Sequence, residues 1–366
     1  MKREYTNLNL ATLKKETEII VEDGLEKIIK PIPNVSAKGV LDPKYYAEIL
    51  PGFEKDGGAE TLAFMSQLGQ RSGEPDGTLT RMVNNGVKSL PITDGVETIH
   101  LTTDNQIPLR LYRKNTKLNA PVLYYIHGGS FSAGQPEVVE ELCKLFVEKT
   151  GFLAVQIDYR LAPENPFPTG LQDCFEGLTW VYQNIQTYQG DPQKITIAGD
   201  SAGGNLAAVC SMMDRDQQTK MVHQQVLYYP SVNMSTKEDE NLNYQAFDFK
   251  PATEQKDLIE VSLEALRLTA SDNLGYMLKA ENLEDPYLSP YLGELQDLPA
   301  TLLIVGEFDY LRIEDEAFAR KLNKANVPVK IIEYRGLGHG FADKIGVWAQ
   351  AEDSVDEMID FVENGL

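Results

Sequence analysis

The chain has 366 residues, with 34 basic and 55 acidic side chains and a formal net charge of −21. A surface of that sign repels phosphate backbones and anionic headgroups, which argues against nucleic-acid and membrane partners. Hydrophobic residues make up 42% and charged residues 24%, values that exclude a disordered chain or a collagen. The length allows two domains, or one large α/β domain with an elaboration.

Cysteine and histidine are sparse. The three cysteines, Cys143, Cys174 and Cys210, are too few for a disulfide framework and fit a reducing compartment. With four histidines and no CxxC pair, we predict no metal site. The first 20 residues lack the apolar core of a signal peptide, and no run of 18 apolar residues occurs, so we expect a cytoplasmic protein.

The first 90 residues have a helical, polar pattern. Apolar residues recur at helix-like spacing over residues 13–29, which predicts a first helix. A second helix is predicted after Asp42, with Asp42 as its cap and Pro43 in its first position. A third is predicted near residues 60–70, and the glycines and proline of residues 73–77 predict a loop.

From Val96 onward, short apolar runs alternate with amphipathic stretches. The predicted strands are residues 96–103, 107–114, 121–129, 152–160, 194–200, 225–230, 300–309 and 329–336. The predicted helices between them are residues 138–150, 171–184, 202–215 and 314–325. This alternation predicts a mostly parallel sheet covered by helices on both faces. The sixth and seventh predicted strands are separated by far more residues than a crossover between parallel strands needs. Residues 232–285 are therefore interpreted as an insertion, with a helix near residues 257–268.

One pentapeptide carries the strongest chemical signal. Gly199 to Gly203 reads GxSxG directly between a predicted strand and a predicted helix. A turn this tight strains its central residue, while the glycines let neighbouring backbone pass, so Ser201 is predicted to be an exposed nucleophile. The alternative is a chance match, because the bare pattern is common. The helix N-terminus behind the serine would favour a developing negative charge.

A serine nucleophile needs a base, and two histidines follow Ser201 in the chain. His339 lies in a glycine-rich loop after the last predicted strand, at the sheet edge where Ser201 is expected. His223 precedes a strand and therefore belongs to the opposite edge. His339 is the predicted base.

The orienting acid is expected just after a strand and before that histidine. Asp309 ends the run ATLLIVGEFD and meets this condition. Its neighbours Glu307, Glu314 and Asp315 are interpreted as a solvated turn and a helix start. Asp309 is the predicted acid.

An oxyanion formed at Ser201 would need backbone N–H donors. Ala202 follows the nucleophile, and Gly128 and Gly129 lie in a glycine turn after an earlier strand, so these three amides are the predicted donors. An ordinary Gly-Gly turn is the alternative. His127 is expected to hold this loop rather than to react.

Two further expectations concern structure. Arg160 and Glu164 are expected to pair and fix the loop after their strand, rather than to take part in chemistry. Asp200, inside the pentapeptide, is expected to bind loop backbone and not to be the acid of the site.

Five motifs in this order resemble the hormone-sensitive lipase-like family of α/β-hydrolase esterases (α/β-hydrolase fold-3). The motifs are HGGS, DYRLAPENPFP, GDSAGGNLAA, DYLRIEDE and GLGHGF. The resemblance covers roughly residues 96–231 and 285–366. It implies an eight-stranded α/β-hydrolase sheet and a helical cap over residues 1–90 and 232–285, with the core in residues 91–231 and 286–366.

The resemblance also implies hydrolysis of carboxylic esters without a cofactor. In the family's motifs, Ser201, Asp309 and His339 match the triad, and Gly128, Gly129 and Ala202 match the oxyanion donors. Three departures are Ser130 where glycine is usual, Tyr310 where proline is common, and Ile313 where aspartate is common. None of them removes a catalytic group.

We therefore expect a serine carboxylesterase that acts on small, short-chain esters. Alternatives are a deacetylase of acetylated sugars or other small molecules, an amidase or peptidase with the same triad, and a silent ligand-binding receptor. Residues 329–336 are expected to form the sheet edge, so a homodimer across that strand is predicted. A monomer is the alternative if another element covers the edge.

Overall fold

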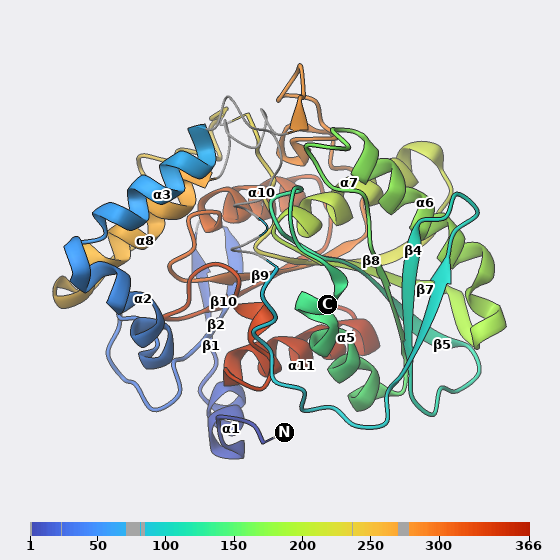
Figure 1. Ribbon diagram of the computed structural model, residues 1–366, viewed down its shortest axis with the longest axis horizontal. Helices are drawn as coiled ribbons and strands as arrows, with labels where there is room; N and C mark the ends of the chain where they lie inside the picture. The colour runs from blue at the N-terminus through green and yellow to red at the C-terminus, as the bar shows by residue number, and fades with distance from the viewer. Residues whose placement is uncertain (1, 23, 71–80, 82–84, 236, 270–277) are drawn as a thin grey trace.

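The computed structural model describes residues 2–22, 24–70, 81, 85–235, 237–269 and 278–366 (Figure 1). The strands are β1 (Glu18–Glu22), β2 (Leu25–Lys30), β3 (Glu97–Thr102), β4 (Pro108–Arg113), β5 (Ala120–Ile126), β6 (Leu153–Ile157), β7 (Gly190–Asp200), β8 (Val222–Tyr228), β9 (Ala300–Gly306) and β10 (Val329–Tyr334). The helices are α1 (Asn7–Lys15), α2 (Pro43–Asp56), α3 (Ala59–Gln70), α5 (Pro136–Thr150), α6 (Thr169–Asn184), α7 (Ala202–Gln217), α8 (Lys256–Thr269), α10 (Arg312–Lys324) and α11 (Ala349–Asn364). Four short 3₁₀ turns are Ile185–Tyr188, Thr253–Gln255, Pro290–Leu292 and Phe341–Lys344.

All the strands join one twisted sheet. Its order is β1-β2-β10-β9-β8-β7-β5-β6-β4-β3, and the strands from β2 through β10 to β6 run parallel in this order. Strands β3 to β10 are the eight expected from the sequence, so that prediction is confirmed; the hairpin β1–β2 extends them on one side. The parallel strands end at one edge, which is where such sheets place their ligand sites.

Helices cover both faces of the sheet, as the continuous apolar strands require. On one face, Val122 and Tyr124 of β5 pack into a buried cluster with α6, α7 and α10. On the other face, Leu123 and Tyr125 pack into a second cluster with α5 and α11. Alternate side chains of one strand therefore serve two cores, because successive residues of a strand point to opposite faces.

The predicted starts of the next helices are confirmed. Asp42 caps α2 by accepting a hydrogen bond from the Lys44 amide, and Pro43 occupies the first turn. Helix α3 follows, and α8 lies inside the expected insertion. Helices α2, α3 and α8 pack together beside the sheet (Figure 1); we call them the helical layer. The loop predicted at residues 73–77 lies outside the described residues.

The helix predicted over residues 13–29 is wrong. Helix α1 ends at Lys15, and the apolar residues after it form the antiparallel hairpin β1–β2. Lys27 and Lys30 on β2 explain the outcome, because they reach acidic side chains on α10 and α11 from buried positions. The Lys27 ammonium lies 2.7 Å from Glu316, and that of Lys30 lies 3.1 Å from Asp353. These contacts are tertiary, so the spacing of apolar residues could not reveal them.

The expectation that residues 329–336 form the sheet edge is also wrong. Strand β10 pairs with β9 on one side and with β2 on the other, so its backbone is already occupied. The edges of the sheet are β1 and β3. The N-terminal hairpin fills the position through which a second copy was expected to pair, which removes the basis for a dimer across β10.

We expect the protein to be a monomer of 40.9 kDa in solution. The new edge strand β1 begins and ends with glutamate, so antiparallel pairing of two β1 strands would set Glu18 opposite Glu22 and place like charges side by side. Light scattering at physiological salt and micromolar concentration measures the mass directly. A mass of twice that value would contradict the monomer.

Within the described ranges, none of the helices combines the length and the apolar composition that crossing a membrane requires.

Candidate active site

Ser201 lies between the end of β7 and the first turn of α7, with φ 55° and ψ −120°. This strained conformation is held by hydrogen bonds on both sides: the Ser201 amide donates to the Tyr228 carbonyl at 2.9 Å, and its carbonyl accepts from Asn205 at 3.0 Å. Glycine is required beside it, because a Cβ on Gly203 would lie 2.6 Å from the carbonyl oxygen of His127. The strand–turn–helix context predicted from the sequence is present.

The three residues predicted to act together meet at the carboxyl edge of the sheet. The Nε2 atom of His339 lies 2.9 Å from the Ser201 hydroxyl, and its Nδ1 atom lies 2.8 Å from Asp309. With the proton of the neutral ring on Nδ1, that nitrogen donates to Asp309 and Nε2 accepts from Ser201. This is the arrangement in which a histidine can remove a serine proton.

Asp309 and His339 are both held in place. The Asp309 carboxylate is fully buried, and its second oxygen accepts the Leu311 amide at 2.9 Å. The ring of Tyr229 meets His339 edge-on at 4.7 Å, and the Tyr229 hydroxyl accepts the Ala342 amide from the same loop. The supporting role of Tyr229 was missed in the sequence, where it is only one aromatic residue after a strand.

The protonation of His339 follows from its surroundings. Burial lowers the pKa of the imidazole, whereas the charge and hydrogen bond of Asp309 raise it, and the net pKa lies above its ordinary value. His223, the rejected candidate, is exposed near the start of β8, at the opposite end of that parallel strand.

One of the expected oxyanion donors, Gly128 in the turn after β5, is already engaged in another hydrogen bond. The Gly128 amide donates to the Asp200 carboxylate at 3.1 Å, so this N–H is not free to face Ser201. Burial raises the pKa of Asp200 to about 6, and the Gly128 hydrogen bond opposes that rise. Asp200 therefore binds the loop backbone, as the sequence analysis expected.

His127 fixes the same turn from below. Its Nδ1 atom donates to the Gly128 carbonyl at 2.8 Å, and its ring stacks on Tyr159 at 4.5 Å between ring centres. Burial lowers the pKa of His127 to about 4, so the ring is neutral near pH 7. The structural role predicted for this histidine agrees with these contacts.

The backbone of the turn then changes direction. Gly129, Ser130 and Phe131 all have positive φ angles, of 123°, 54° and 59°. Within the described part of the chain, the amides of Gly129, Ser130 and Ala202 have no recorded hydrogen-bond acceptor. Gly129 and Ala202 were expected from the sequence and Ser130 was not, because the sequence of three adjacent residues does not reveal which amide is already bonded.

The expected pairing of Arg160 with Glu164 is wrong. The Arg160 guanidinium instead contacts Asp173 of α6, with one N–O distance of 2.6 Å. Glu164 lies 2.6 Å from Arg81, whose Nε also donates to the Ser132 carbonyl at 2.9 Å. Arg81 thus ties the N-terminal region to the turn beside Ser201. In each observed pair, Arg160 with Asp173 and Arg81 with Glu164, the two residues lie well apart in the sequence. Spacing along the chain therefore favoured the wrong partner for Arg160.

Of the acidic residues around Asp309, Glu314 and Asp315 are buried and Glu307 is partly exposed. Glu314 is buried and accepts the Val232 amide at 2.7 Å, which secures the loop after β8. Glu307 accepts the Gly336 amide at 2.7 Å. Burial raises the pKa of each of these two carboxyls to about 7. Asp315 is fully buried as well, and Glu314 and Asp315 both lie in the first turn of α10, so the predicted helix start is confirmed. The expectation that these carboxyls are solvated is wrong, because Glu307 and Glu314 accept hydrogen bonds from loop backbone.

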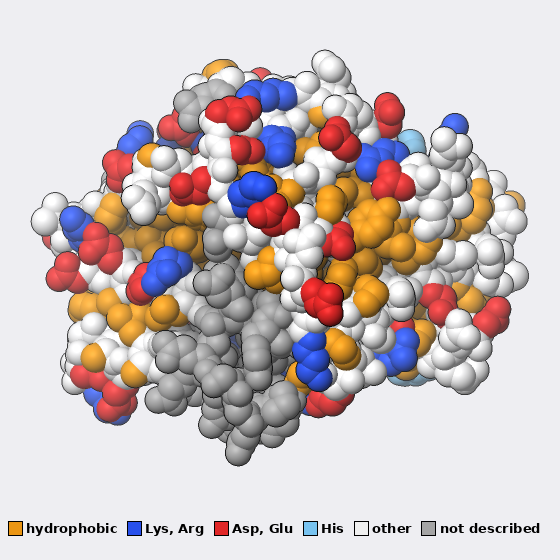
Figure 2. All heavy atoms as spheres, turned by 90° about the horizontal axis from the view of Figure 1, so that it is seen from above, with side chains coloured by type: hydrophobic (Ala, Val, Ile, Leu, Met, Phe, Trp, Pro, Cys, Tyr) orange, Lys and Arg blue, Asp and Glu red, His pale blue; other side chains and the backbone are white. Residues whose placement is uncertain are grey.

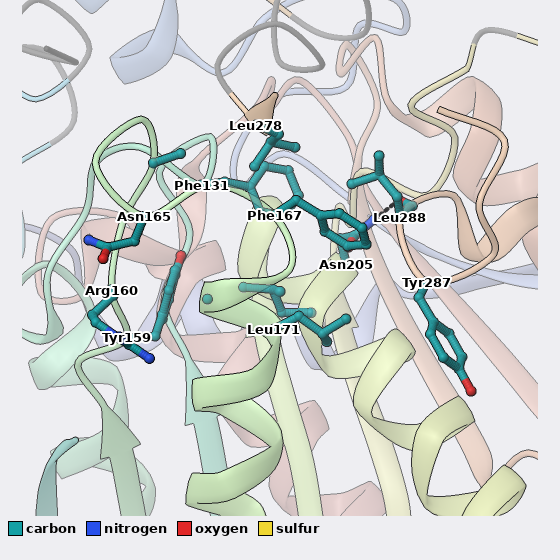
Figure 3. A pocket seen from close by; sticks show the side chains of 13 residues that line it. Phe131, Tyr159, Arg160, Asn165, Phe167, Leu171, Asn205, Leu278, Tyr287 and Leu288 are labelled. Atoms are coloured by element: carbon teal, nitrogen blue, oxygen red, sulfur yellow. Dashed lines mark hydrogen bonds between the residues drawn. The ribbon is translucent and has the colours of Figure 1, made fainter. Parts of the chain in front are cut away.

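A small open pocket lies between α6, α7 and the loops that carry Phe131, Phe167 and Leu288. Figure 3 shows Phe131, Phe167 and Leu278 gathered above Leu171 of α6, with Asn165 at one side. Phe131 directly follows the turn that carries Gly129 and Ser130. Most of the side chains around the cavity are apolar, so it suits a small apolar group.

The sequence profile of the α/β-hydrolase fold family matches residues 123–343, which include Ser201, Asp309 and His339. The chain belongs to this family. The match confirms the α/β-hydrolase fold and agrees with the resemblance to the hormone-sensitive lipase-like esterases. The architecture and the family assignment therefore rest on independent observations.

Named relatives of this α/β-hydrolase chain include esterases. A carboxylesterase of Mycobacterium tuberculosis, NlhH, is 31% identical over 238 residues, which cover 65% of this chain and 72% of the relative. An arylesterase of Saccharolobus solfataricus is 29% identical over 242 residues, covering 65% and 74%. A solved esterase of Pyrobaculum calidifontis superposes with a TM-score of 0.66 at 27% identity, covering 88% of this chain and 98% of that one.

Proposed function

We propose that the protein is a serine carboxylesterase that works through an acyl-enzyme intermediate. The single observation that carries the proposal is the continuous hydrogen-bonded line from Ser201 through His339 to the buried Asp309, with distances of 2.9 and 2.8 Å. Relatives named carboxylesterase and arylesterase support the choice of esters as substrates.

The reaction proceeds in two halves at this line. The Ser201 hydroxyl attacks the ester carbonyl while His339 accepts its proton, and Asp309 stabilises the resulting imidazolium and holds the ring orientation. The tetrahedral intermediate then collapses: the bond between the carbonyl carbon and the alkoxy oxygen breaks, His339 gives its proton to the leaving alcohol, and the acyl group stays on Ser201. Water, deprotonated by His339, attacks the acyl group and releases the acid with Ser201 restored. This route needs no cofactor.

Backbone amides stabilise the tetrahedral oxyanion in this proposal. Gly129 and Ala202 remain as donors, and Ser130 takes the place of Gly128, whose N–H is engaged by Asp200. The role of Gly128 is to anchor the turn. Its carbonyl and amide are bonded to His127 and Asp200, and a pre-positioned turn spares reorganisation during the reaction.

The acid limb of the pH profile follows from the pKa of His339. Only the neutral imidazole accepts the serine proton, so kcat/KM falls as pH drops through that pKa. Because Asp309 and the nearby carboxylates raise the pKa above 6.5 despite burial, we expect the midpoint of the limb above pH 6.5. Initial rates at low ester concentration over a pH series measure it, and a midpoint well below 6.5 would contradict the account.

The proposed substrates are dissolved esters with short acyl chains. The cavity next to Phe131 suits a small apolar group. On the face seen in Figure 2, Asp, Glu, Lys and Arg side chains interrupt the hydrophobic areas, which disfavours flat contact with a lipid surface. Deacetylation of sugars or other small molecules fits the same preference. A silent receptor is less consistent with the site, because the complete serine–histidine–aspartate line is assembled.

A series of p-nitrophenyl esters of increasing acyl length tests the substrate class. We expect kcat/KM to be highest for chains of two to about six carbons, since the neighbouring cavity is small and open. A maximum at long chains, together with activation when the ester forms an oil–water interface, would contradict the short-chain proposal.

We also propose a cytoplasmic location and a cap role for the helical layer. The three cysteines are free and buried, which is compatible with a reducing compartment. Helices α2 and α8 come from the two separate sequence regions expected to form the cap, and they pack together beside the carboxyl edge of the sheet. Substrate selection would then depend on their side chains.

A further inference from the structure

The loop that carries His339 is in close contact with a tyrosine from the helical layer. A Cβ placed on Gly338, the residue before His339, would contact the hydroxyl of Tyr45 and lie 2.7 Å from its Cζ and 2.9 Å from its Cε1. Real Cβ atoms essentially never come this near to carbon. No positive φ is recorded for Gly338, so the contact with Tyr45, rather than backbone conformation, is what requires glycine here.

Tyr45 is not free to move away from this contact. It lies on α2, is 9% exposed, and its hydroxyl is 3.1 Å from the Ser262 hydroxyl on α8. On another side its ring meets Trp348 edge-on at 5.8 Å. Burial raises the pKa of Tyr45 to about 12, so the phenol is neutral and acts through its shape and its hydrogen bond.

The chain leading to Tyr45 joins the same two parts of the molecule. The Asp42 amide donates to the Gly336 carbonyl at 2.9 Å, in the loop before His339. The Leu41 amide donates to the Gln255 side chain at 2.7 Å, next to α8. The segment from Leu41 to Tyr45 is therefore bonded to the histidine loop and to the insertion at once.

We infer that Tyr45 is a positioning residue for His339. It packs against Gly338 and so sets where the imidazole stands relative to Ser201, and through Ser262 it links that position to α8. The inference rests on the proposed esterase function. It adds that Tyr45 of the helical layer and Gly338 of the core, more than 290 positions apart in the chain, pack against each other and so hold His339 in place.

A double-mutant cycle between the two positions tests the inference. Gly338→Ala introduces a methyl group into the space of the Tyr45 ring, and displacement of the His339 loop by a fraction of an ångström is expected to lower kcat by about 10- to 100-fold. Tyr45→Ala in the same chain opens that space. Although Tyr45→Ala alone lowers kcat, the double variant is expected to have a kcat close to that of Tyr45→Ala and above that of Gly338→Ala.

Two readouts separate positioning from a general loss of structure. The rate of Ser201 labelling by a fluorophosphonate reports activation of the serine by His339, and it should follow kcat through the cycle while KM changes little. The control is Gly52→Ala, which adds a methyl group to α2, the helix that carries Tyr45. The nearest neighbouring atom to that Cβ, the Thr61 hydroxyl oxygen, lies 3.3 Å away. That variant should keep wild-type rates.

Each possible result either supports or overturns the inference. Recovery in the double variant supports the inference. A Gly338→Ala variant within about twofold of wild type, or one that Tyr45→Ala fails to rescue, overturns it. If Gly338→Ala does not fold, Tyr45→Ala is compared with Tyr45→Phe: the inference requires slow labelling only in the alanine variant, and equal rates overturn it. Turnover by the wild type, and its loss in Ser201→Ala, test the esterase function separately.

Discussion

Replacing Ser201 by alanine is expected to lower ester turnover by about 10⁴-fold or more. The change removes the hydroxyl that lies 2.9 Å from His339, so no acyl-enzyme can form. Any residual rate would come from water attack in a site that still binds and polarises the ester. The measurement is kcat for p-nitrophenyl acetate, with folding checked by circular dichroism.

A serine on the helix that follows Ser201 provides the matched control. Ser211 is buried in α7, and its hydroxyl donates to the Ala207 carbonyl at 3.1 Å. Ser211→Ala removes the same atom from this helix and should keep near-normal turnover. Near-normal turnover in Ser201→Ala would instead overturn the assignment of the nucleophile and the function built on it.

Replacing Asp309 by asparagine is expected to lower kcat by about 10⁴-fold while leaving the fold intact. The carboxylate now accepts from both the Leu311 amide and His339 Nδ1. An amide of the same shape can turn its NH₂ group toward the ring, which stabilises the wrong tautomer and no longer stabilises the imidazolium. Because Asp309 also raises the pKa of His339, the acid limb of kcat/KM should move to lower pH.

Asp315→Asn is the control for this prediction. Asp315 is as deeply buried as Asp309 and lies six residues further on, and its carboxylate oxygens have no hydrogen-bond partner among the described residues. Burial raises the pKa of Asp315 well above its usual range, and Asp315→Asn keeps the side-chain shape without removing a hydrogen bond among the described residues. An unchanged pH limb in Asp309→Asn, or an equal loss in the control, would contradict the role of Asp309.

The three reactive residues could be predicted because each follows a strand of one parallel sheet. Strand ends of the same direction meet at one edge, so Ser201 after β7, Asp309 after β9 and His339 after β10 had to be neighbours in space. His223 was rejected by the same rule. Position relative to strands is local information that a single sequence contains.

The N-terminal hairpin could not be predicted in this way. Residues 18–30 contain short apolar runs between charged side chains, a pattern that suits a helix or a strand, and the choice depends on partners more than 280 residues away. The buried ammonium groups of Lys27 and Lys30 are paired with Glu316 on α10 and Asp353 on α11. The wrong edge strand, and the dimer expected from it, followed directly from this missing hairpin.

The proposed oxyanion donors could be predicted only in part from the sequence. Gly128, Gly129 and Ser130 are consecutive, and the motif alone does not tell which amides point at Ser201. The answer depends on Asp200, which takes the Gly128 amide from a different strand. In the same way, Glu164 is nearer to Arg160 in the sequence, but the Arg160 guanidinium binds Asp173. The carboxylate of Asp173 on α6 accepts two hydrogen bonds from it, at 2.6 and 2.9 Å.

Covalent trapping of the nucleophile tests the central claim most directly. The full-length protein is treated with a fluorophosphonate, its intact mass is measured, and the modified peptide is sequenced by mass spectrometry. The account predicts one adduct per chain, on Ser201, forming in parallel with loss of p-nitrophenyl acetate turnover and absent from Ser201→Ala. An adduct on another residue, or full loss of turnover without modification of Ser201, would contradict it.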